Sequence, residues 1–349
     1  MGKKVKLTDA CEFQGGSQPP KNQWINRSEE GYVRMLQIRD FTQKNVLTEY
    51  VKLTNTTKLC ESSDILIARY GASVGKILTG LKGAYNVAIM KTIPDEKVLL
   101  KKYLYYYLNS TEFQQIIKNV GSRAAQAGFN KEDLANIEIY LPKIEAQRKI
   151  IKVLEKAEKA LGKRKEAIRL LDELVKSQFI EMFGDPNTNT KGWNLKKFAD
   201  ICENKDSNRI PLKQSDRDKR HGEYPYYGAT GIIDYIDEHI FEGLHLLIAE
   251  DGKNLETKNK DIAFLAQDKF WVNNHAHVVV ETSESNLYYL KYVINNISLK
   301  PYITGIDQLK LNRSNLDSIV INVPPIELQN QFAEFVNQVD SRVDLHLTM

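Results

Sequence analysis

The sequence predicts an α+β protein made of two copies of one unit, each a globular domain followed by a long helix. Three observations predict this class: a long heptad pattern in mid-chain, a second one at the C-terminal end, and a repeat of the segment before each. The 349 residues suffice for two domains of ordinary size. We expect the helices to form an antiparallel coiled coil that separates the two globular domains with pseudo-twofold symmetry.

The first long helix is predicted over residues 143–184. Its apolar residues recur at steps of three and four, with polar interruptions at Arg164 and Gln178. A stripe this narrow needs a partner helix to become buried. Gly184 and the proline after Asp185 end the helix. The predicted seam consists of Ile150, Leu154, Ala157, Leu161, Ile168, Leu171, Val175 and Met182.

The second helix is predicted over residues 325–349 from the internal repeat. Residues 129–147 align without a gap over residues 311–329, and Asn, Leu, Ile, Ile, Pro, Ile, Glu and Gln recur in register. The globular domains are therefore predicted over residues 1–142 and 185–324. The alternative to a helix pair is that each helix packs on its own domain. The same register continues the seam with Phe332, Val336, Val339 and Val343.

Local patterns predict the elements of the first domain. Apolar runs predict strands over residues 65–68 and 85–90, and a tyrosine-rich stretch predicts a helix over 101–108. Alternation predicts a strand over 137–141, which Pro142 ends.

Composition narrows the class of protein. With 42% hydrophobic and 27% charged residues, the chain is typical of soluble globular proteins. The sequence contains no run of 18 apolar residues, so no membrane span is predicted. Its three cysteines are widely spaced and form no zinc-binding or disulfide pattern. We therefore expect a reduced, cytoplasmic protein. The formal net charge of +4 is too small to establish nucleic-acid binding, although it permits local basic surfaces.

Several motifs resemble those of one known family. The repeated Asn-x3-Leu-x2-Ile-x-Ile-x-x-Pro-x-Ile-Glu-x-Gln segment resembles the conserved region of type I restriction-modification specificity subunits. Residues 178–186, at the end of the first helix, and residues 224–233 are similar to further segments of that family. The resemblance covers nearly the whole chain, as two target-recognition domains and two conserved helices.

The resemblance implies a function without catalysis. Each target-recognition domain would read one half of a split double-stranded DNA sequence, and the helices would set the spacing and dock the modification (methyltransferase) subunits. Restriction subunits would join through that complex, and S-adenosylmethionine, ATP and magnesium would be bound by the partner subunits rather than by this chain. Because the second helix is short, either the helix pair would be partly unpaired, or a modification subunit or another copy of this chain would cover the exposed seam of the first helix. The alternative is a degenerate specificity subunit or coiled-coil scaffold that does not read DNA.

Base reading is predicted for polar and basic side chains in loops between strands, because Arg and Lys contact guanine and Asn and Gln contact adenine. The resemblance transfers no base contacts, and an ordinary solvated surface is the alternative at each position. The candidates are Arg69, Tyr70, Ser73, Lys76, Arg123 and Gln126 in the first domain and Tyr226, Tyr227, Thr230, Lys253, Asn254, Gln308 and Lys310 in the second.

Four segments superficially resemble catalytic or metal-binding motifs. Residues 71–77 are one residue short of a phosphate-binding loop and lack the Ser or Thr after lysine. Residues 94–97 place adjacent carboxylates in a turn, and residues 185–187 lack the aromatic residue of an adenine methyltransferase site. His275 and His277 have no evident third ligand, so we expect packed or hydrogen-bonded histidines and no metal site.

Overall fold

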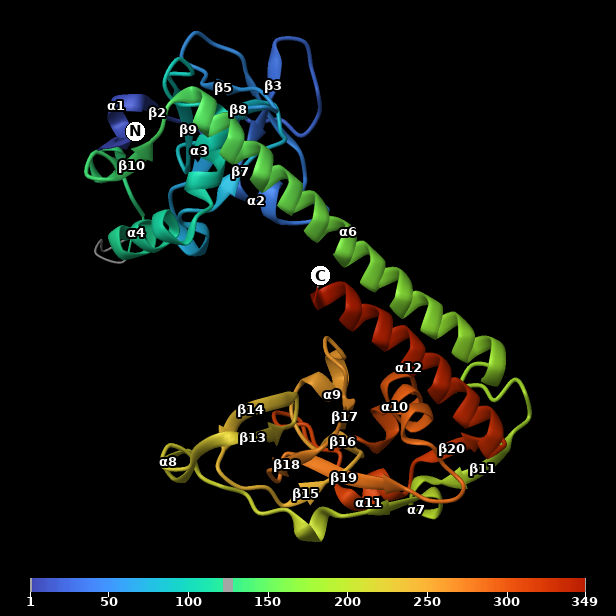
Figure 1. Ribbon diagram of the computed structural model, residues 1–349. Helices are drawn as coiled ribbons and strands as arrows, with labels where there is room; N and C mark the ends of the chain where they lie inside the picture. Colours follow the sequence, from blue (N-terminus) through green and yellow to red (C-terminus); the bar gives the residue numbers. More distant parts are fainter. Residues whose placement is uncertain (1, 122–127, 349) are drawn as a thin grey trace. The chain divides into compact units, whose positions relative to one another are not determined.

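The computed structural model describes residues 2–121 and 128–348, with side chains through Arg342 in the last helix. Contacts between residues divide the chain into two compact units, Met1–Leu161 and Gly162–Met349 (Figure 1). The division falls inside the longest helix, α6 (Ile144–Phe183), which therefore contributes to both units.

The first unit contains two four-stranded sheets and a two-stranded ribbon. The sheets have the strand orders β2-β9-β6-β7 and β4-β3-β8-β5, and the ribbon pairs β1 with β10. The strands are β1 (Lys3–Lys6), β2 (Cys11–Gly15), β3 (Tyr32–Leu36), β4 (Glu49–Lys52), β5 (Leu59–Cys60), β6 (Leu66–Ala68), β7 (Ile77–Leu78), β8 (Gly83–Tyr85), β9 (Ile89–Pro94) and β10 (Glu138–Leu141). The helices are α1 (Leu7–Ala10), α2 (Ile38–Thr42), α3 (Lys101–Leu108), α4 (Thr111–Gly121) and α5 (Lys131–Leu134), with short 3-10 helices η1 (Lys21–Gln23) and η2 (Gly71–Ser73).

The second unit has the same set of sheets, with the orders β12-β19-β16-β17 and β14-β13-β18-β15 and the ribbon β11-β20. Its strands are β11 (Asn194–Lys197), β12 (Cys202–Asn204), β13 (His221–Gly228), β14 (Gly231–Ile236), β15 (Phe241–Glu242), β16 (His245–Ala249), β17 (Ala263–Ala266), β18 (Lys269–Val272), β19 (Ala276–Glu281) and β20 (Val320–Val323). Its helices are α7 (Phe198–Ile201), α8 (Gln214–Arg217), α9 (Asn254–Thr257), α10 (Leu287–Asn296), α11 (Arg313–Asp317) and α12 (Ile326–Thr348), with η3 (Asp206–Asn208) and η4 (Lys300–Tyr302).

The two units repeat one topology, element by element. Each second sheet contains one parallel pair, β3 with β8 and β13 with β18, among antiparallel pairs. The central strands β6 and β16 are buried along their whole length, which explains their unbroken apolar runs. The internal repeat predicted from sequence is confirmed, and so is the α+β class.

One predicted strand is divided in the structure. Residues 85–90 were expected to be continuous, but β8 ends at Tyr85 and β9 begins at Ile89. Between them, the Asn86 side chain accepts a hydrogen bond from the Ala88 N–H at 3.2 Å, and the Ile89 N–H donates to the Asn86 carbonyl at 3.0 Å. Asparagine thus replaces the ladder with a local turn, and the chain changes from one sheet to the other.

The helix that follows each domain is fastened by a buried glutamine from the repeated motif. The Gln147 side chain is fully buried in the first turn of α6. Its Nε2 donates to the carbonyl oxygens of Val98, at 2.7 Å, and Pro142, at 2.8 Å. Its Oε1 accepts from the N–H of Leu100, which precedes α3, at 2.9 Å.

Gln329 makes the equivalent bonds in the second unit. It donates to the carbonyl oxygens of Glu284 and Pro324 and accepts from the N–H of Asn286, at 3.1, 2.9 and 2.9 Å. Each glutamine thus ties the strand end, the helix start and a neighbouring helix N-terminus together. This function explains why Gln recurs in register in both halves.

Aromatic packing joins α12 to the end of α6 in the second unit. Phe332, near the start of α12, lies with its ring centroid 5.3 Å from that of Phe179 and 5.6 Å from that of Phe183. Further along, Val336 of α12 lines a groove with Val175 of α6. Because later residues of α12 meet earlier residues of α6, the two segments run antiparallel.

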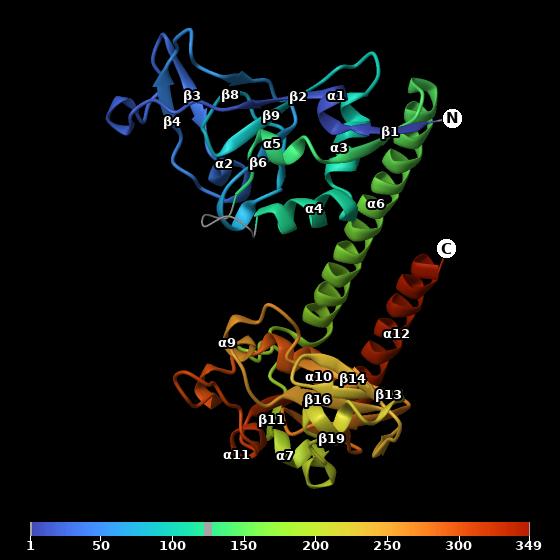
Figure 2. The same ribbon diagram turned by 90° about the vertical axis from the view of Figure 1, so that its left-hand side faces the viewer.

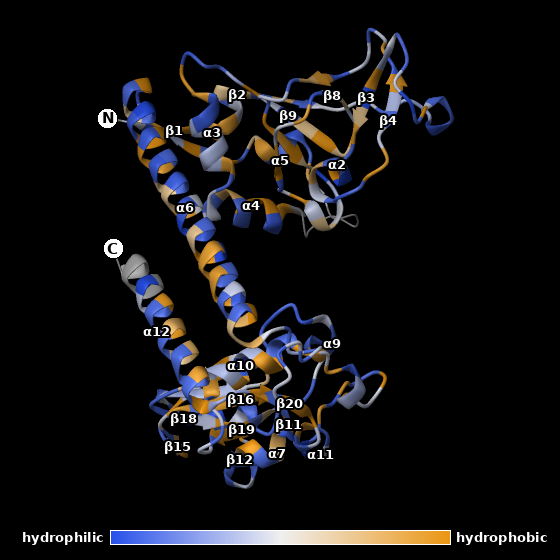
Figure 3. Cartoon of the chain, turned by 90° about the vertical axis from the view of Figure 1, so that its right-hand side faces the viewer, coloured by the Kyte–Doolittle hydropathy of each residue, from blue (hydrophilic) through white to orange (hydrophobic). Residues whose placement is uncertain are grey.

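The predicted seam is covered over only part of its length. Phe332 and Val339 are buried, and Leu171, Val175, Met182 and Val336 are half-buried. The earlier seam residues are exposed in the single chain, and Figure 3 shows apolar positions recurring along α6. These exposed residues are Ile150, Leu154, Ala157, Leu161 and Ile168, whereas the Val343 side chain lies outside the described residues.

No helix among the described residues is long and apolar enough to cross a membrane. All three cysteines, Cys11, Cys60 and Cys202, are buried free thiols. Burial raises the pKa of the Cys11 thiol to about 12, so this group is inert rather than reactive.

Candidate nucleic-acid interface

Two loops of the second unit are held side by side at the end of β16. One comprises residues 250–258 and includes α9, and the other comprises residues 303–310. The Gly252 N–H donates to the Leu309 carbonyl at 3.0 Å, and the Leu311 N–H donates to the Glu250 carbonyl at 2.8 Å. In Figure 2, α9 and the orange-red second loop lie at the same edge of this unit. We call residues 250–258 and 303–310 the second loop pair.

The first unit joins the equivalent segments in the same way. Tyr70 forms an isolated antiparallel bridge with Gly128, as Asp251 does with Lys310. The Phe129 N–H donates to the Arg69 carbonyl at 3.3 Å. The loop after β6 therefore meets Gly128 and Phe129, and we call residues 69–76 and 128–129 the first loop pair. In the second unit this pairing brings together the loops that carry Lys253 and Lys310, which are far apart in the sequence.

Arg69 supports its loop through backbone contacts. Its Nε donates to the carbonyl oxygen of Phe129 at 3.2 Å, and its Nη1 donates to that of Val87 at 3.3 Å. Its guanidinium also lies 5.1 Å from the centre of the Tyr70 ring. Arg69 thus has a structural role in placing the first loop pair, a role that its sequence position alone did not indicate.

The remaining first-unit candidates differ in accessibility. Tyr70 and Lys76 are exposed, Ser73 is half-buried in η2, and the Lys76 ammonium is available to a phosphate. Arg123 and Gln126 lie outside the described residues.

In the second loop pair, Lys253, Gln308 and Lys310 are exposed. Asn254 is half-buried, and its side-chain amide closes the loop by bonding both the N–H and the carbonyl of Lys260, each at 3.0 Å. Asn254 therefore shapes the loop, whereas the other three present free surface to a ligand.

The two candidate tyrosines of β13 pack into the core, which corrects the expectation for Tyr226. Tyr226 is 0% exposed, and its Oη accepts from the Leu212 N–H at 2.9 Å, so it does not reach the surface. Tyr227 is half-buried, with its ring 5.7 Å from that of Phe270, and burial raises the pKa of its phenol. Thr230 is exposed in the turn after β13.

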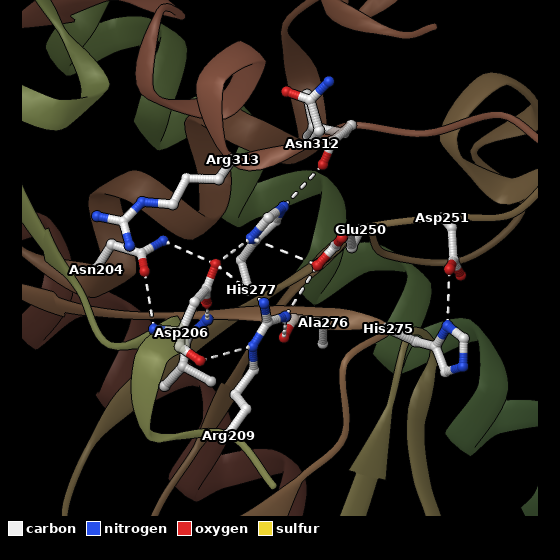
Figure 4. Close-up of polar contacts among 12 residues, drawn as sticks. Asn204, Asp206, Arg209, Glu250, Asp251, His275, Ala276, His277, Asn312 and Arg313 are labelled. Atoms are coloured by element: carbon white, nitrogen blue, oxygen red, sulfur yellow. Dashed lines mark hydrogen bonds and ion pairs between the residues drawn. The ribbon is translucent and has the colours of Figure 1, made fainter. Parts of the chain in front are cut away.

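A buried charged cluster lies beneath the second loop pair (Figure 4). The His277 side chain is 1% exposed, with Nδ1 2.6 Å from Oδ2 of Asp206 and Nε2 2.7 Å from the carbonyl oxygen of Leu311. Arg209 donates through Nη1 to Oε2 of Glu250 at 2.9 Å and lies 3.3 Å from Asp206. The cluster thus holds Glu250, at the start of one loop, and Leu311, directly after the other.

The Asp206 carboxylate is held in its charged form. Burial would raise its pKa, but the hydrogen bond and charge of His277, the Val278 N–H and the charge of Arg209 together lower it below the ordinary value. In the first unit the equivalent carbonyl, that of Phe129, is bonded by Arg69 instead. Each unit therefore uses a side-chain nitrogen, from Arg69 or His277, to hold the equivalent backbone carbonyl.

The two candidate histidines, His275 and His277, are hydrogen-bonded. Both ring nitrogens of His277 are occupied, and Nδ1 of His275 lies 2.7 Å from Oδ2 of Asp251. Over the range that the structure describes, no group of three His, Cys, Asp or Glu side chains is placed to bind a metal ion. The hydrogen-bonded interpretation of these histidines is confirmed for His277 and His275.

Sequence reasoning missed two features of this site. The Asp206–Arg209–Glu250–His277 cluster draws residues from three segments of the chain, and no spacing in the sequence signals that these segments meet. Ile306, at the tip of the second loop, is 95% exposed, and only the neighbouring Gly305 indicated a tight turn there.

Two copies of one sheet domain, each with a loop pair at its edge and a long helix after it, define a duplicated binding protein. Its family follows from comparison with known proteins. The chain belongs to the type I restriction modification DNA specificity domain family, whose model matches residues 2–170 and 190–348.

Relatives agree with this assignment. A putative type I restriction enzyme specificity subunit of Haemophilus influenzae is 36% identical over 143 residues, which cover 41% of this chain and 35% of that protein. The MjaVIII specificity subunit of Methanocaldococcus jannaschii is 19% identical over 98% of this chain and 86% of its own length. A crystal structure of the S subunit of a type I restriction-modification system from M. genitalium has the same fold, with a TM-score of 0.60 and 16% identity over 100% of this chain and 91% of that one.

The chain is therefore the DNA specificity subunit of a type I restriction-modification system, a component without catalysis of its own.

Proposed function

We propose that this subunit reads a bipartite double-stranded DNA target, with one half-site contacted by each loop pair. The observation that carries the proposal is the repetition of the loop pair at the same place in both units, at the end of β6 and at the end of β16. A duplicated reader fits a target with two separate halves. Exposed Lys76, Lys253 and Lys310 supply charges for backbone phosphates, and Gln308 supplies an amide for adenine.

The helices are proposed to dock the modification subunits, through which restriction subunits join the complex. The support is the exposed apolar part of α6, where Leu161, Ile168, Leu170 and Leu174 face solvent in the single chain. Apolar residues repeated along a helix are usually covered by a partner. A second copy of this chain is the alternative partner for this surface. S-adenosylmethionine, ATP and magnesium are assigned to the partner subunits.

The experiment is adenine-methylation mapping in cells that express this chain together with its modification subunit. We expect a split motif whose first half changes when residues 1–142 are replaced by those of a relative, and whose second half stays the same. A purified, intact complex that methylates no defined motif would support the rival function, a degenerate subunit or scaffold that assembles without reading DNA.

A further inference from the structure

Ile306 is an apolar side chain placed almost wholly in solvent. It is 95% exposed, the highest value among the large hydrophobic residues that the structure describes. Its neighbours in the loop behave differently, since Ile303 and Leu309 pack against the core of the second unit. The loop therefore anchors two apolar residues inward and directs a third outward.

The loop is a closed, well-defined turn. Thr304 and Lys310 exchange both backbone hydrogen bonds, at 2.9 and 2.8 Å. Gly305 has φ +91°, and a Cβ there would lie 2.2 Å from the Gln308 carbonyl oxygen, so the tight turn requires glycine. A second pair of bonds joins the loop to residues 250 and 252. The loop thus holds Ile306 in a fixed position. A side chain that contacts a ligand at a defined place needs such a rigid support.

The loop differs in chemistry from its counterpart. The first unit has Ser-Arg-Ala-Ala-Gln-Ala at residues 122–127, where the second has Thr-Gly-Ile-Asp-Gln-Leu at residues 304–309. The flanking residues, by contrast, repeat in register, as Phe129-Asn130 and Leu311-Asn312 do. If the two units bind different half-sites, the difference must come from segments that differ between the two units within the shared fold. This loop is such a segment.

We propose that Ile306 reads a thymine in the half-site of the second unit, by packing against the 5-methyl group in the major groove. That groove admits a two-stranded turn, and the methyl group is the apolar feature that separates thymine from the other bases there. Gln308, Lys310 and Lys253 lie exposed in the same loop pair and supply the polar contacts around it. This inference rests on the proposed function.

The test removes the 5-methyl group of thymine from the DNA and the Ile306 side chain from the protein, first separately and then together. Once the motif is mapped, each thymine of the second half-site is replaced by deoxyuridine in synthetic duplexes. Binding to the specificity–modification complex is measured by fluorescence anisotropy at fixed salt. We expect one substitution to weaken wild-type binding about fourfold, as loss of one buried methyl group should. The Ile306→Ala variant should bind the thymine duplex about tenfold more weakly and should not distinguish uridine from thymine at that position.

Leu195→Ala is the matched control, because Leu195 is also an exposed apolar residue, on β11, away from the loop pair. It should keep wild-type affinity and the uridine effect. Ile306→Ala should unfold at the wild-type temperature, because Ile306 is 95% exposed. Leu195→Ala should lower that temperature only slightly, because Leu195 is 60% exposed. A half-site without thymine, or equal uridine effects in wild type and Ile306→Ala, overturns this inference alone. A wild-type complex that prefers no duplex overturns the proposed function, and this inference with it.

Discussion

The buried glutamines offer the sharpest test of how each helix is fixed to its domain. Replacement of Gln147 by Leu keeps the size of the side chain but removes the two bonds it donates and the one it accepts. The buried Pro142 carbonyl then loses its partner, and so do the partly buried Val98 carbonyl and Leu100 N–H. Gln329→Leu does the same at the equivalent place in the second unit.

The magnitude follows from three lost hydrogen bonds. At a net value of about 1 kcal/mol each, the loss is about 3 kcal/mol, because unpaired groups that water cannot reach keep their desolvation cost. Burial of the new leucine carbons returns up to about 1 kcal/mol. We therefore expect the free energy of unfolding of the affected unit to fall by about 2–3 kcal/mol.

The assay is urea denaturation of the full chain, followed by hydrogen exchange of backbone amides to separate the two units. Gln147→Leu should lower protection in the first unit only, and Gln329→Leu in the second only. Each variant thus serves as the control for the other. A loss below about 1 kcal/mol in both would refute the role of these side chains as fasteners, since three bonds cannot then contribute as argued.

Three further predictions concern the second unit. Phe332→Ala should lower the free energy of unfolding of the second unit by about 3–5 kcal/mol, because a buried ring that packs against Phe179 and Phe183 is lost. Thermal unfolding would measure this loss. A loss no greater than that of the surface variant Leu195→Ala would contradict the prediction. Gly305→Ala should weaken binding of the cognate duplex about tenfold or more, because residue 305 must leave its φ of +91° and the loop must change shape. The unfolding temperature should change little. Anisotropy titrations that match those of the wild type would contradict this prediction. The pKa of Asp206 is lowered in the folded protein, so its carboxylate contributes stability above about pH 4, and this contribution is lost as the pH falls through the folded pKa. Asp206→Asn should therefore have a lower free energy of unfolding at pH 7, and its free energy of unfolding should depend less on pH on the acid side. Curves of unfolding free energy against pH that run parallel for the variant and the wild type would refute this prediction.

The sequence predicted the architecture because the architecture is repeated. The motif that contains Gln147 and Gln329 recurs with every spacing intact, so one alignment located both strand-to-helix junctions and both long helices. The apolar run at residues 65–68 was predicted to be a strand because a fully buried strand needs no alternation, and β6 covers Leu66–Ala68 of it.

The candidate site was predicted less completely, for a physical reason. Whether a tyrosine in β13 points outward depends on which face of the sheet is covered, and a strand with aromatic residues at successive positions does not reveal this. Tyr226 therefore proved to be buried. The cluster around His277 depends on segments 30 to 70 residues apart along the chain, which only the fold brings together. Ile306 was overlooked because an isoleucine is expected inside, and its exposure depends on the turn at Gly305.

The ribbons β1–β10 and β11–β20 also bear on how such a protein changes over generations. Lys3 pairs with Leu141, and Asn194 pairs with Val323, so the chain leaves each domain beside the strand by which it came in. A segment closed in this way can be exchanged by recombination between related genes without moving its two ends apart. The helices that follow would keep their attachment points through Gln147 and Gln329. New specificities can therefore arise by the transfer of a whole cassette in one step, rather than by the slow accumulation of point substitutions in a single reader.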